Sequence, residues 1–189
     1  MPAEPTYVPN MTAALMTADQ LLHVSIPGKR VELVRGALIV REPPGYQHGR
    51  VVAELALQLG NHLRATRIGQ ITVGDTGFKI ATNPDTVRGA DIAFINGDRV
   101  PAPGTVGFPT MGPDLVVEVL SPHDRPGETL AKVGDWLEAG TKLVWVIDPE
   151  RRAARVYRQD GTETSINAEE QLEGEDVLPG FSCPLTAIL

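Results

Sequence analysis

A carboxylate stands inside an apolar run of the chain, and a buried carboxylate needs a partner. Residues 114–122, DLVVEVLSP, are typical of a strand buried on both faces, yet Glu118 lies near their middle. A lone buried carboxylate costs several kcal/mol, or its pKa rises, by about 3–5 units at the extreme. We therefore expect a cation or a hydrogen-bond donor to meet Glu118 in the folded protein.

Three further residues could join this site. Asp91 begins a predicted strand after a glycine-containing loop, Lys132 lies in the helix predicted next, and Glu32 lies in the first predicted hairpin. Each has a simpler interpretation, because Asp91 could stabilise its own loop while Lys132 and Glu32 could face solvent. Glu118 itself could form a structural ion pair with an arginine. Composition and spacing alone predict only a soluble α/β domain with an unusual buried carboxylate.

The elements that must position these residues can be read from local patterns. Thr17 is a candidate N-cap for a short helix, and RVELV, RG and ALIVRE predict a hairpin that turns at Arg35–Gly36. GQITV and TGFKIA predict two strands around Gly74–Asp75. Between the hairpin and these strands, an amphipathic helix over about 47–66 is predicted from apolar residues at helical spacing, namely Val51, Val52, Leu55, Leu59 and Leu63.

The second half of the chain predicts further strands and one more helix. After the loop NPDTVRGA, the strand DIAFI starts at Asp91, and 96–113 is predicted to be irregular. A helix over about 127–139 ends at Gly140, and three segments follow, a buried strand KLVWVID, a hairpin of AARVYRQ and ETSIN, and a polar tail ending in FSCPLTAIL. This βαβ-like order predicts an α/β or α+β sheet with a helix on each face. We expect residues 1–16 to be a flexible lead and 17–189 to form one domain.

Composition limits the class of protein. The 189 residues are 42% hydrophobic and 22% charged, with no apolar run near the roughly 20 residues that span a bilayer. The first residues lack the pattern of a signal peptide, so a cytoplasmic protein is expected. The single cysteine, Cys183, excludes an internal disulfide and is expected to be packed as a small hydrophobe. A net charge of −7 excludes a generally basic coat protein and argues weakly against nucleic acid, although a basic groove could sit on an acidic body.

A family resemblance gives these residues a shared context. The run RVELVRGALIV…H…VRGADIAFI…GPDLVVEVLSP…LAKVGDWLEAGTKLVWVIDP…VYR resembles the Uma2 family of restriction-endonuclease-like proteins, over roughly residues 15–160. PDLVVEVLSP and LVWVIDP are its most specific parts. The family resembles the PD-(D/E)XK nuclease superfamily, which implies a restriction-endonuclease-like fold, a mixed central sheet flanked by helices with an acidic site on adjacent strands.

The resemblance also implies roles for individual residues. Asp91 matches the Asp of the PD half-motif, with Ala90 in place of proline, and Glu118 matches the second acid. Leu120 stands where the superfamily usually has lysine, so Lys132 is the candidate replacement. Glu32 matches a recurring position and is expected to be an auxiliary acid. His48 also matches a recurring position, where it could serve the site or simply start a helix.

Such a site would hydrolyse phosphodiester bonds of DNA with Mg²⁺ or Mn²⁺. These cations take hard oxygen ligands, and the resemblance implies Asp91, Glu118 and the main-chain carbonyl of Val119 as the metal ligands. Lys132 would orient or help to deprotonate the attacking water. Candidate phosphate contacts are scattered basic residues, namely Lys79, Arg88, Arg125, Lys142, Arg151, Arg152, Arg155 and Arg158.

The sequence leaves a second class of function open. Leu120 and the acidic net charge favour an inactive descendant of the nuclease fold that serves as a binding or assembly module. The combination of Glu32, Asp91, Glu118 and Lys132 favours the nuclease. A cation plugged between the acids would favour the inactive protein, and an open face would favour a metal site. We also expect a homodimer, because LVWVIDP and the later hairpin offer flat apolar surface.

Overall fold

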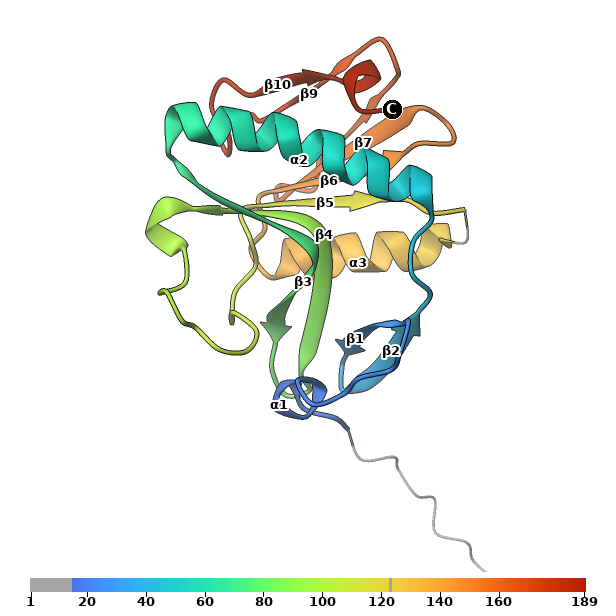
Figure 1. Ribbon diagram of the computed structural model, residues 1–189, viewed down its shortest axis with the longest axis vertical. Coiled ribbons are helices and arrows are strands. Elements are labelled where there is room, and N and C mark those ends of the chain that lie inside the picture. Colours follow the sequence, from blue (N-terminus) through green and yellow to red (C-terminus); the bar gives the residue numbers. More distant parts are fainter. Residues whose placement is uncertain (1–14, 123) are drawn as a thin grey trace, which may run out of the picture.

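An eight-stranded mixed sheet lies between two helices in the computed structural model, which describes residues 15–122 and 124–189 (Figure 1). The strand order is β2-β1-β4-β5-β6-β7-β8, with β3 paired to β4, and β5–β6 is the parallel pair. A small β9–β10 sheet follows. The bounds are α1 Ala18–Leu21, β1 Arg30–Val34, β2 Ala37–Arg41, α2 Tyr46–Thr66, β3 Gly69–Ala81, β4 Thr86–Asn96, η1 Gly97–Arg99, β5 Leu115–Val119, α3 Pro126–Glu138, β6 Leu143–Asp148, β7 Ala153–Arg158, β8 Glu163–Ile166, β9 Gln171–Glu173, β10 Ser182–Pro184 and η2 Leu185–Ala187.

The N-terminal elements form as their local sequence predicts. Thr17 caps α1, accepting a hydrogen bond from Gln20 N at 3.3 Å while the Gln20 side chain accepts one from Thr17 N. The β1–β2 hairpin turns at Arg35 and Gly36, which both have positive φ as a two-residue hairpin turn requires. Of the expected flexible lead, residues 1–14 lie outside the described part of the chain.

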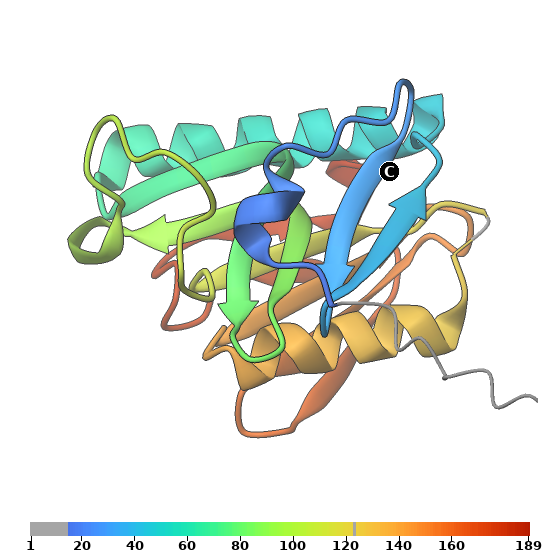
Figure 2. The same cartoon turned by 90° about the horizontal axis from the view of Figure 1, so that it is seen from below.

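The two main helices cover opposite faces of the sheet, as predicted (Figures 1 and 2). Helix α2 buries its predicted apolar stripe, except for Val52, which is only partly buried. On the same face lie Val117 and Val119 of β5, while Val116 packs with Trp136 of α3 on the other face. Strand β5 therefore alternates between two apolar layers, which confirms that it is buried on both faces.

Two predicted boundaries around the site were wrong. GQITV and TGFKIA are one strand, β3, which continues through an irregularity at Gly74–Asp75 because its pairing with β4 resumes beyond it. Strand β4 begins at Thr86, so Asp91 lies in the middle of a strand and does not open it. Gly89, within the same strand, lies close to the backbone of β3: a Cβ at this position would be 3.0 Å from Asp75 O, a tight contact.

The C-terminal segment is also different from the polar tail that was expected. Its apolar residues pack into the α2-side core, and Phe181 stacks on Trp145 at 5.8 Å between ring centroids. Cys183 is buried among them, as predicted for a small hydrophobe. In the short strands β9 and β10, one buried residue lies between two exposed ones, so few apolar residues stand together and the segment looks polar in the sequence. In the described residues, no helix has both the length and the apolar character to cross a membrane.

Candidate functional site

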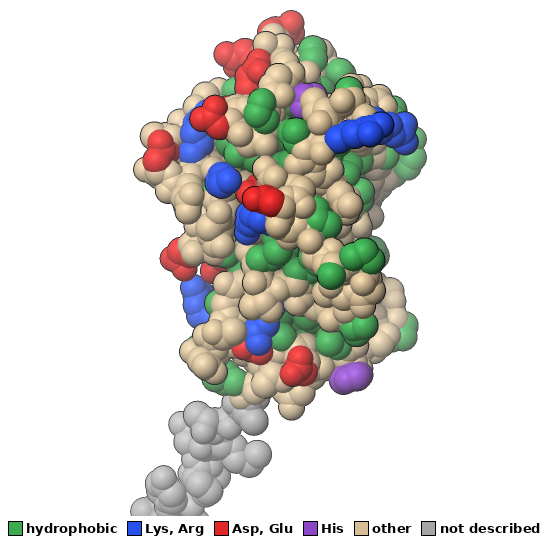
Figure 3. All heavy atoms as spheres, turned by 90° about the vertical axis from the view of Figure 1, so that its left-hand side faces the viewer, with side chains coloured by type: hydrophobic (Ala, Val, Ile, Leu, Met, Phe, Trp, Pro, Cys, Tyr) green, Lys and Arg blue, Asp and Glu red, His purple; other side chains and the backbone are tan. Residues whose placement is uncertain are grey.

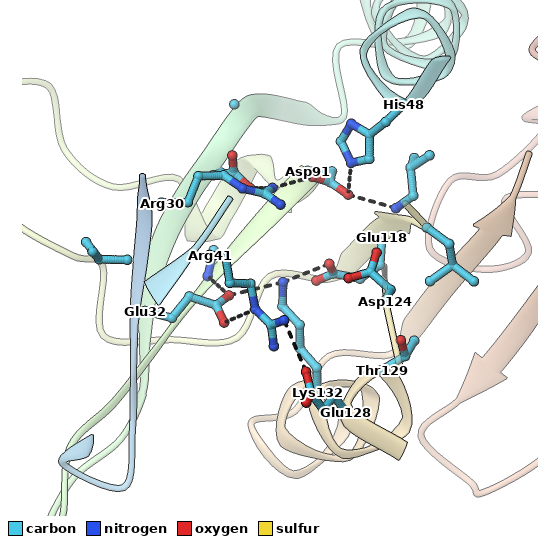
Figure 4. A pocket seen from close by; sticks show the side chains of 16 residues that line it. Arg30, Glu32, Arg41, His48, Asp91, Glu118, Asp124, Glu128, Thr129 and Lys132 are labelled. Carbon is cyan, nitrogen blue, oxygen red and sulfur yellow. Dashed lines mark hydrogen bonds and ion pairs between the residues drawn. The ribbon is translucent and has the colours of Figure 1, made fainter. Parts of the chain in front are cut away.

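A pocket of about 310 Å³ opens where β1, β4, β5, α2 and α3 meet, and the predicted site residues line it (Figure 4). Glu118 reaches it because β5 alternates. Val117 and Val119 face α2, so the intervening carboxylate faces α3. Six acidic and three basic side chains line this pocket, which leaves it with an excess of negative charge.

Glu118 meets two donors from a single helix. Lys132 Nζ lies 2.8 Å from its Oε2, and Trp136 Nε1 donates to its Oε1 at 2.9 Å. Lys132 and Trp136 are four residues apart on α3, so they share one helix face. The expectation that a cation or donor would meet this buried carboxylate is therefore confirmed, with one of each.

Glu32 is held from the opposite side of the same ammonium group. Lys132 Nζ lies 3.1 Å from Glu32 Oε1, and Gly89 N donates to that oxygen at 2.9 Å. Arg88 Nη1 donates to Oε2 at 2.9 Å, and the same guanidinium binds Asp135. Burial raises the pKa of Glu32, but Lys132, Arg88 and the Gly89 N–H outweigh it and lower that pKa to about 2. Glu32 is therefore ionised at neutral pH and ties Lys132 in place.

The two carboxylate oxygens of Asp91 differ in their hydrogen bonds. Val119 N donates to Oδ2 at 2.7 Å, and His48 Nε2 lies 3.1 Å from it. Within residues 15–122 and 124–189 no group hydrogen-bonds Oδ1, and Arg30 Nη1 is 3.7 Å away. Burial raises the pKa of Asp91, but the His48 hydrogen bond, His48 and Lys132 charges and the Val119 N–H lower it overall. Asp91 thus presents an ionised, open oxygen to the pocket.

Glu118 shows the combined effect of burial and of neighbouring acids. Burial, with Asp91 and Glu32 adding repulsion, outweighs Lys132 and raises the pKa of Glu118 to about 7. Burial alone would lower the pKa of Lys132, but Glu118, Glu32 and Asp91 raise it overall. The two shifts differ in origin, because burial is the largest cause for Glu118 and the neighbouring acids are the cause for Lys132. Glu32 has Arg88 as a further cationic partner, whereas the cation in contact with Glu118 is the Lys132 ammonium that it shares with Glu32. Lys132 therefore stays charged, and Glu118 is the acid left short of positive charge.

The donor set fits a hard divalent cation. Mg²⁺ is commonly bound by one or two carboxylates, with water and substrate oxygens completing its coordination. Among the described residues Asp91 Oδ1 accepts no hydrogen bond, although Arg30 Nη1 lies 3.7 Å away, and each oxygen of Glu118 accepts a single N–H, which leaves it a second lone pair. Among the described residues, no cluster of three or more His, Cys, Asp or Glu side chains forms a ready-made cage. The fit is therefore to an ion that keeps part of its hydration.

Sequence reasoning found the acids and the lysine but missed residues that hold them. Trp136 could have been found from its spacing to Lys132 on one helix. Arg30 and Arg41 line the pocket without having been singled out. Arg88 was expected to contact phosphate, which is wrong, because its side chain is 6% exposed and closed between Glu32 and Asp135. Spacing alone gives no signal that this arginine is buried.

A family model described as "Putative restriction endonuclease" matches residues 18–186. The chain belongs to the Uma2 family. A search of curated proteins gave no match. Among solved structures, a chain from Anabaena variabilis, described as "a putative nuclease belonging to DUF820", is similar with a TM-score of 0.81 at 18% identity, over 92% of this chain and 97% of that one. This likeness shows the restriction-endonuclease-like fold, and the family assignment supports a nuclease-like function.

Proposed function

We propose that this Uma2 protein is a metal-dependent endonuclease that hydrolyses phosphodiester bonds of DNA in the pocket of Figure 4. The observation that carries the proposal is the open Oδ1 of Asp91 in a pocket with surplus negative charge. A purely structural network would balance its buried charges, because unpaired buried charge is costly. Here the missing charge is positive, next to the oxygen ligands that a hard cation takes.

Mg²⁺ or Mn²⁺ would be held by Asp91, Glu118 and the carbonyl of Val119, the last residue of β5. When bound, the ion would neutralise charge on the phosphate oxygens and make a bound water more acidic. His48 and Val119 N hold Asp91 by its other oxygen, which orients Oδ1 toward the pocket. Such second contacts fix the direction in which a ligand points.

Lys132 would act as a donor of positive charge. Its raised pKa keeps Nζ protonated, so the earlier option that it deprotonates water is the weaker one. Nζ would instead hydrogen-bond the attacking water or the phosphate and stabilise the charge that develops there. Glu32 is then a positioning residue that acts through Lys132, since its oxygens are taken by Lys132, Gly89 and Arg88.

The reaction is a hydrolysis. The oxygen of water forms a bond to phosphorus, one bridging P–O bond breaks, and the products are a phosphate monoester and an alcohol. One proton of the water is released, and the departing oxygen gains one. Neither step needs a redox partner or a nucleophilic side chain of the protein.

One observation favours the second class of function, an inactive binding or assembly module. Lys132 lies between Glu32 and Glu118, as a plug would, and both oxygens of Glu118 already accept hydrogen bonds. The expected homodimer remains a prediction. Of the two segments on which it was based, the apolar strand β6 is covered within the chain, which leaves the later hairpin. Light scattering that shows a monomer would remove this prediction.

Plasmid cleavage in Mn²⁺ tests the proposal. Asp91→Ala and Glu118→Gln should each slow cleavage about a thousandfold or more, because each removes charge where the phosphate reacts. Glu169→Gln, at an exposed acid near the C-terminus, is the matched control and should cleave like the wild type. A wild type that does not cut would assign the protein to the inactive class. If the wild type and both site variants cut as fast as the control, cleavage does not take place at Asp91 and Glu118, and the proposed site is wrong.

A further inference from the structure

Two arginines stand directly opposite each other at the mouth of the pocket. Arg30 of β1 pairs in register with Arg41 of β2, and both side chains line the pocket (Figure 4). Cross-strand neighbours lie about 5 Å apart at Cβ, and like charges in such a pair are destabilising. The hairpin therefore places two cations side by side where it lines the acidic pocket, and each of them contacts an acid, Asp75 for Arg30 and Glu128 for Arg41.

The irregularity in β3 explains how the Arg30 guanidinium is oriented toward Asp91. Asp75 follows Gly74 at the register shift, and its Oδ1 accepts from Arg30 Nη1 at 2.7 Å. Bulges of this kind commonly redirect a side chain beside a functional site. Glu42 O accepts from Arg30 Nε at 3.4 Å, so the guanidinium is held from two sides. These contacts leave Arg30 Nη1 3.7 Å from the open Oδ1 of Asp91.

Arg41 is held further out. Its Nη1 donates to Glu128 Oε2 at 3.2 Å, and its Nε lies 4.0 Å from Glu32 Oε2. The Arg30 and Arg41 side chains are 26% and 29% exposed, so a ligand in the pocket can reach them. Arg88, the other arginine near the acids, is enclosed. A guanidinium offers two parallel N–H groups that match the oxygens of a phosphate.

Other basic residues give no comparable arrangement. Lys79, Lys142 and Arg158 are not among the residues that line this pocket, and they form ion pairs elsewhere with Asp85, Asp114 and Glu175. On the face shown in Figure 3, basic and acidic side chains are interspersed, without a continuous basic stripe. Beside the enclosed Arg88 and the Lys132 ammonium between the acids, Arg30 and Arg41 are partly exposed arginines that line the pocket next to the candidate catalytic acids.

We propose that Arg30 and Arg41 form a two-point binding site for neighbouring phosphates of the DNA backbone. Arg30, beside Asp91, binds the phosphate that is cut, and Arg41 binds the next phosphate at the rim. The inference rests on the proposed function for its ligand, but it concerns binding, which can be measured without cleavage. A phosphate-binding role also explains both the opposed arginines and the irregularity at Gly74–Asp75.

Fluorescence anisotropy of a labelled 20-base-pair DNA duplex with the full chain tests this site. Titrations run in Ca²⁺, which takes oxygen ligands, at several salt concentrations, with a gel to verify that the DNA stays intact. Arg30→Gln and Arg41→Gln should each reduce the slope of log affinity against log salt by about 1, and the double variant by about 2. Arg64→Gln, at an exposed arginine in the last turn of α2, should match the wild type.

Two further readouts separate a phosphate contact from a structural role. Arg30→Lys keeps the charge and should restore the salt slope, whereas a variant that merely misfolds would lose its thermal transition. In plasmid cleavage, Arg30→Gln should lower kcat, because the phosphate beside Asp91 is the one that reacts. Arg41→Gln should mainly raise KM, because its phosphate is not the one that is cut.

The outcomes distinguish this inference from the proposed nuclease activity. If the wild type binds and cuts DNA while neither glutamine variant changes the salt slope, the arginine site is wrong and the nuclease stands. If the slope depends on the arginines but no metal supports cleavage, the arginine site stands and the nuclease fails. A folded wild type that does not bind the duplex overturns both.

Discussion

The two ends of β5 each bury an acid, and the two acids differ in how many cations they meet. Asp114, just before the strand, lies 2.8 Å from Arg99 Nη1 and 3.2 Å from Lys142 Nζ, and accepts a hydrogen bond from Asn96 N at 2.9 Å. Glu118, near the other end, shares a single ammonium with other carboxylates.

The pKa values move in opposite directions as a result. Burial raises the pKa of Asp114, but Asn96 N–H, Lys142 and Arg99 outweigh it and lower that pKa overall. For Glu118, burial and neighbouring acids prevail and raise the pKa to about 7. A buried acid with spare cations anchors the fold, here the loop before β5. A buried acid that lacks positive charge can accept another cation, and this contrast separates a structural acid from a candidate ligand.

Calorimetric titration with Mn²⁺ should show the largest difference between the acids at the two ends of β5. We expect the wild type to bind the ion, and Asp91→Asn and Glu118→Gln to lose about 100-fold or more in affinity. Asp114→Asn should bind like the wild type. Affinity should rise as pH increases through about 7, since Glu118 must release its proton to become a ligand. Equal weakening by Asp114→Asn and Glu118→Gln would erase the contrast, and an absence of binding by the wild type would remove the metal site.

The next largest effect is expected in the pH dependence of the free energy of unfolding, measured with denaturant and without metal. The folded-state pKa of Glu118 lies above its ordinary value of 4.5, so the folded protein holds more protons between pH 4.5 and about 7. The free energy of unfolding should therefore fall as pH rises through this window, by about 2–4 kcal/mol from this group.

Glu118→Gln should flatten that fall, and Asp114→Asn should leave it in place. Asp114 has the opposite sign: its lowered pKa stabilises the fold above the ordinary value of 3.8 and is lost only in more acidic solution. Parallel curves for the wild type and Glu118→Gln between pH 4.5 and 7 would contradict the raised pKa.

Trp136→Phe should have the smallest effect. It removes the N–H donor from Glu118 Oε1, so the pKa of Glu118 should rise further, by about half a unit to one unit. The acidic limb of the pH–cleavage profile should move upward by the same amount. Trp145→Phe is a matched control, because in the described residues its buried indole N–H has no partner. A shift of the limb in the control but not in Trp136→Phe would show that ring packing, and not the hydrogen bond, matters.

Much of the scaffold follows from local patterns. The hairpin turn at Arg35–Gly36, the stripe of α2 and the apolar run of β5 were predicted because each depends on residues close in sequence. The continuous β3 was missed because its irregularity depends on pairing with β4. The packed C-terminal segment was missed because short strands hide alternate residues in a core formed by distant elements.

The features of the site likewise divide into those that local sequence predicts and those that depend on tertiary packing. The sequence determined that Glu118 would be buried and would need a partner, because a carboxylate in an apolar strand cannot stay alone. Tertiary structure alone decided that Lys132 would be shared with Glu32, that Trp136 would supply the second donor and that Arg88 would be enclosed. Charge balance depends on distances between side chains that are far apart along the chain, and only the packing of strands against helices sets those distances.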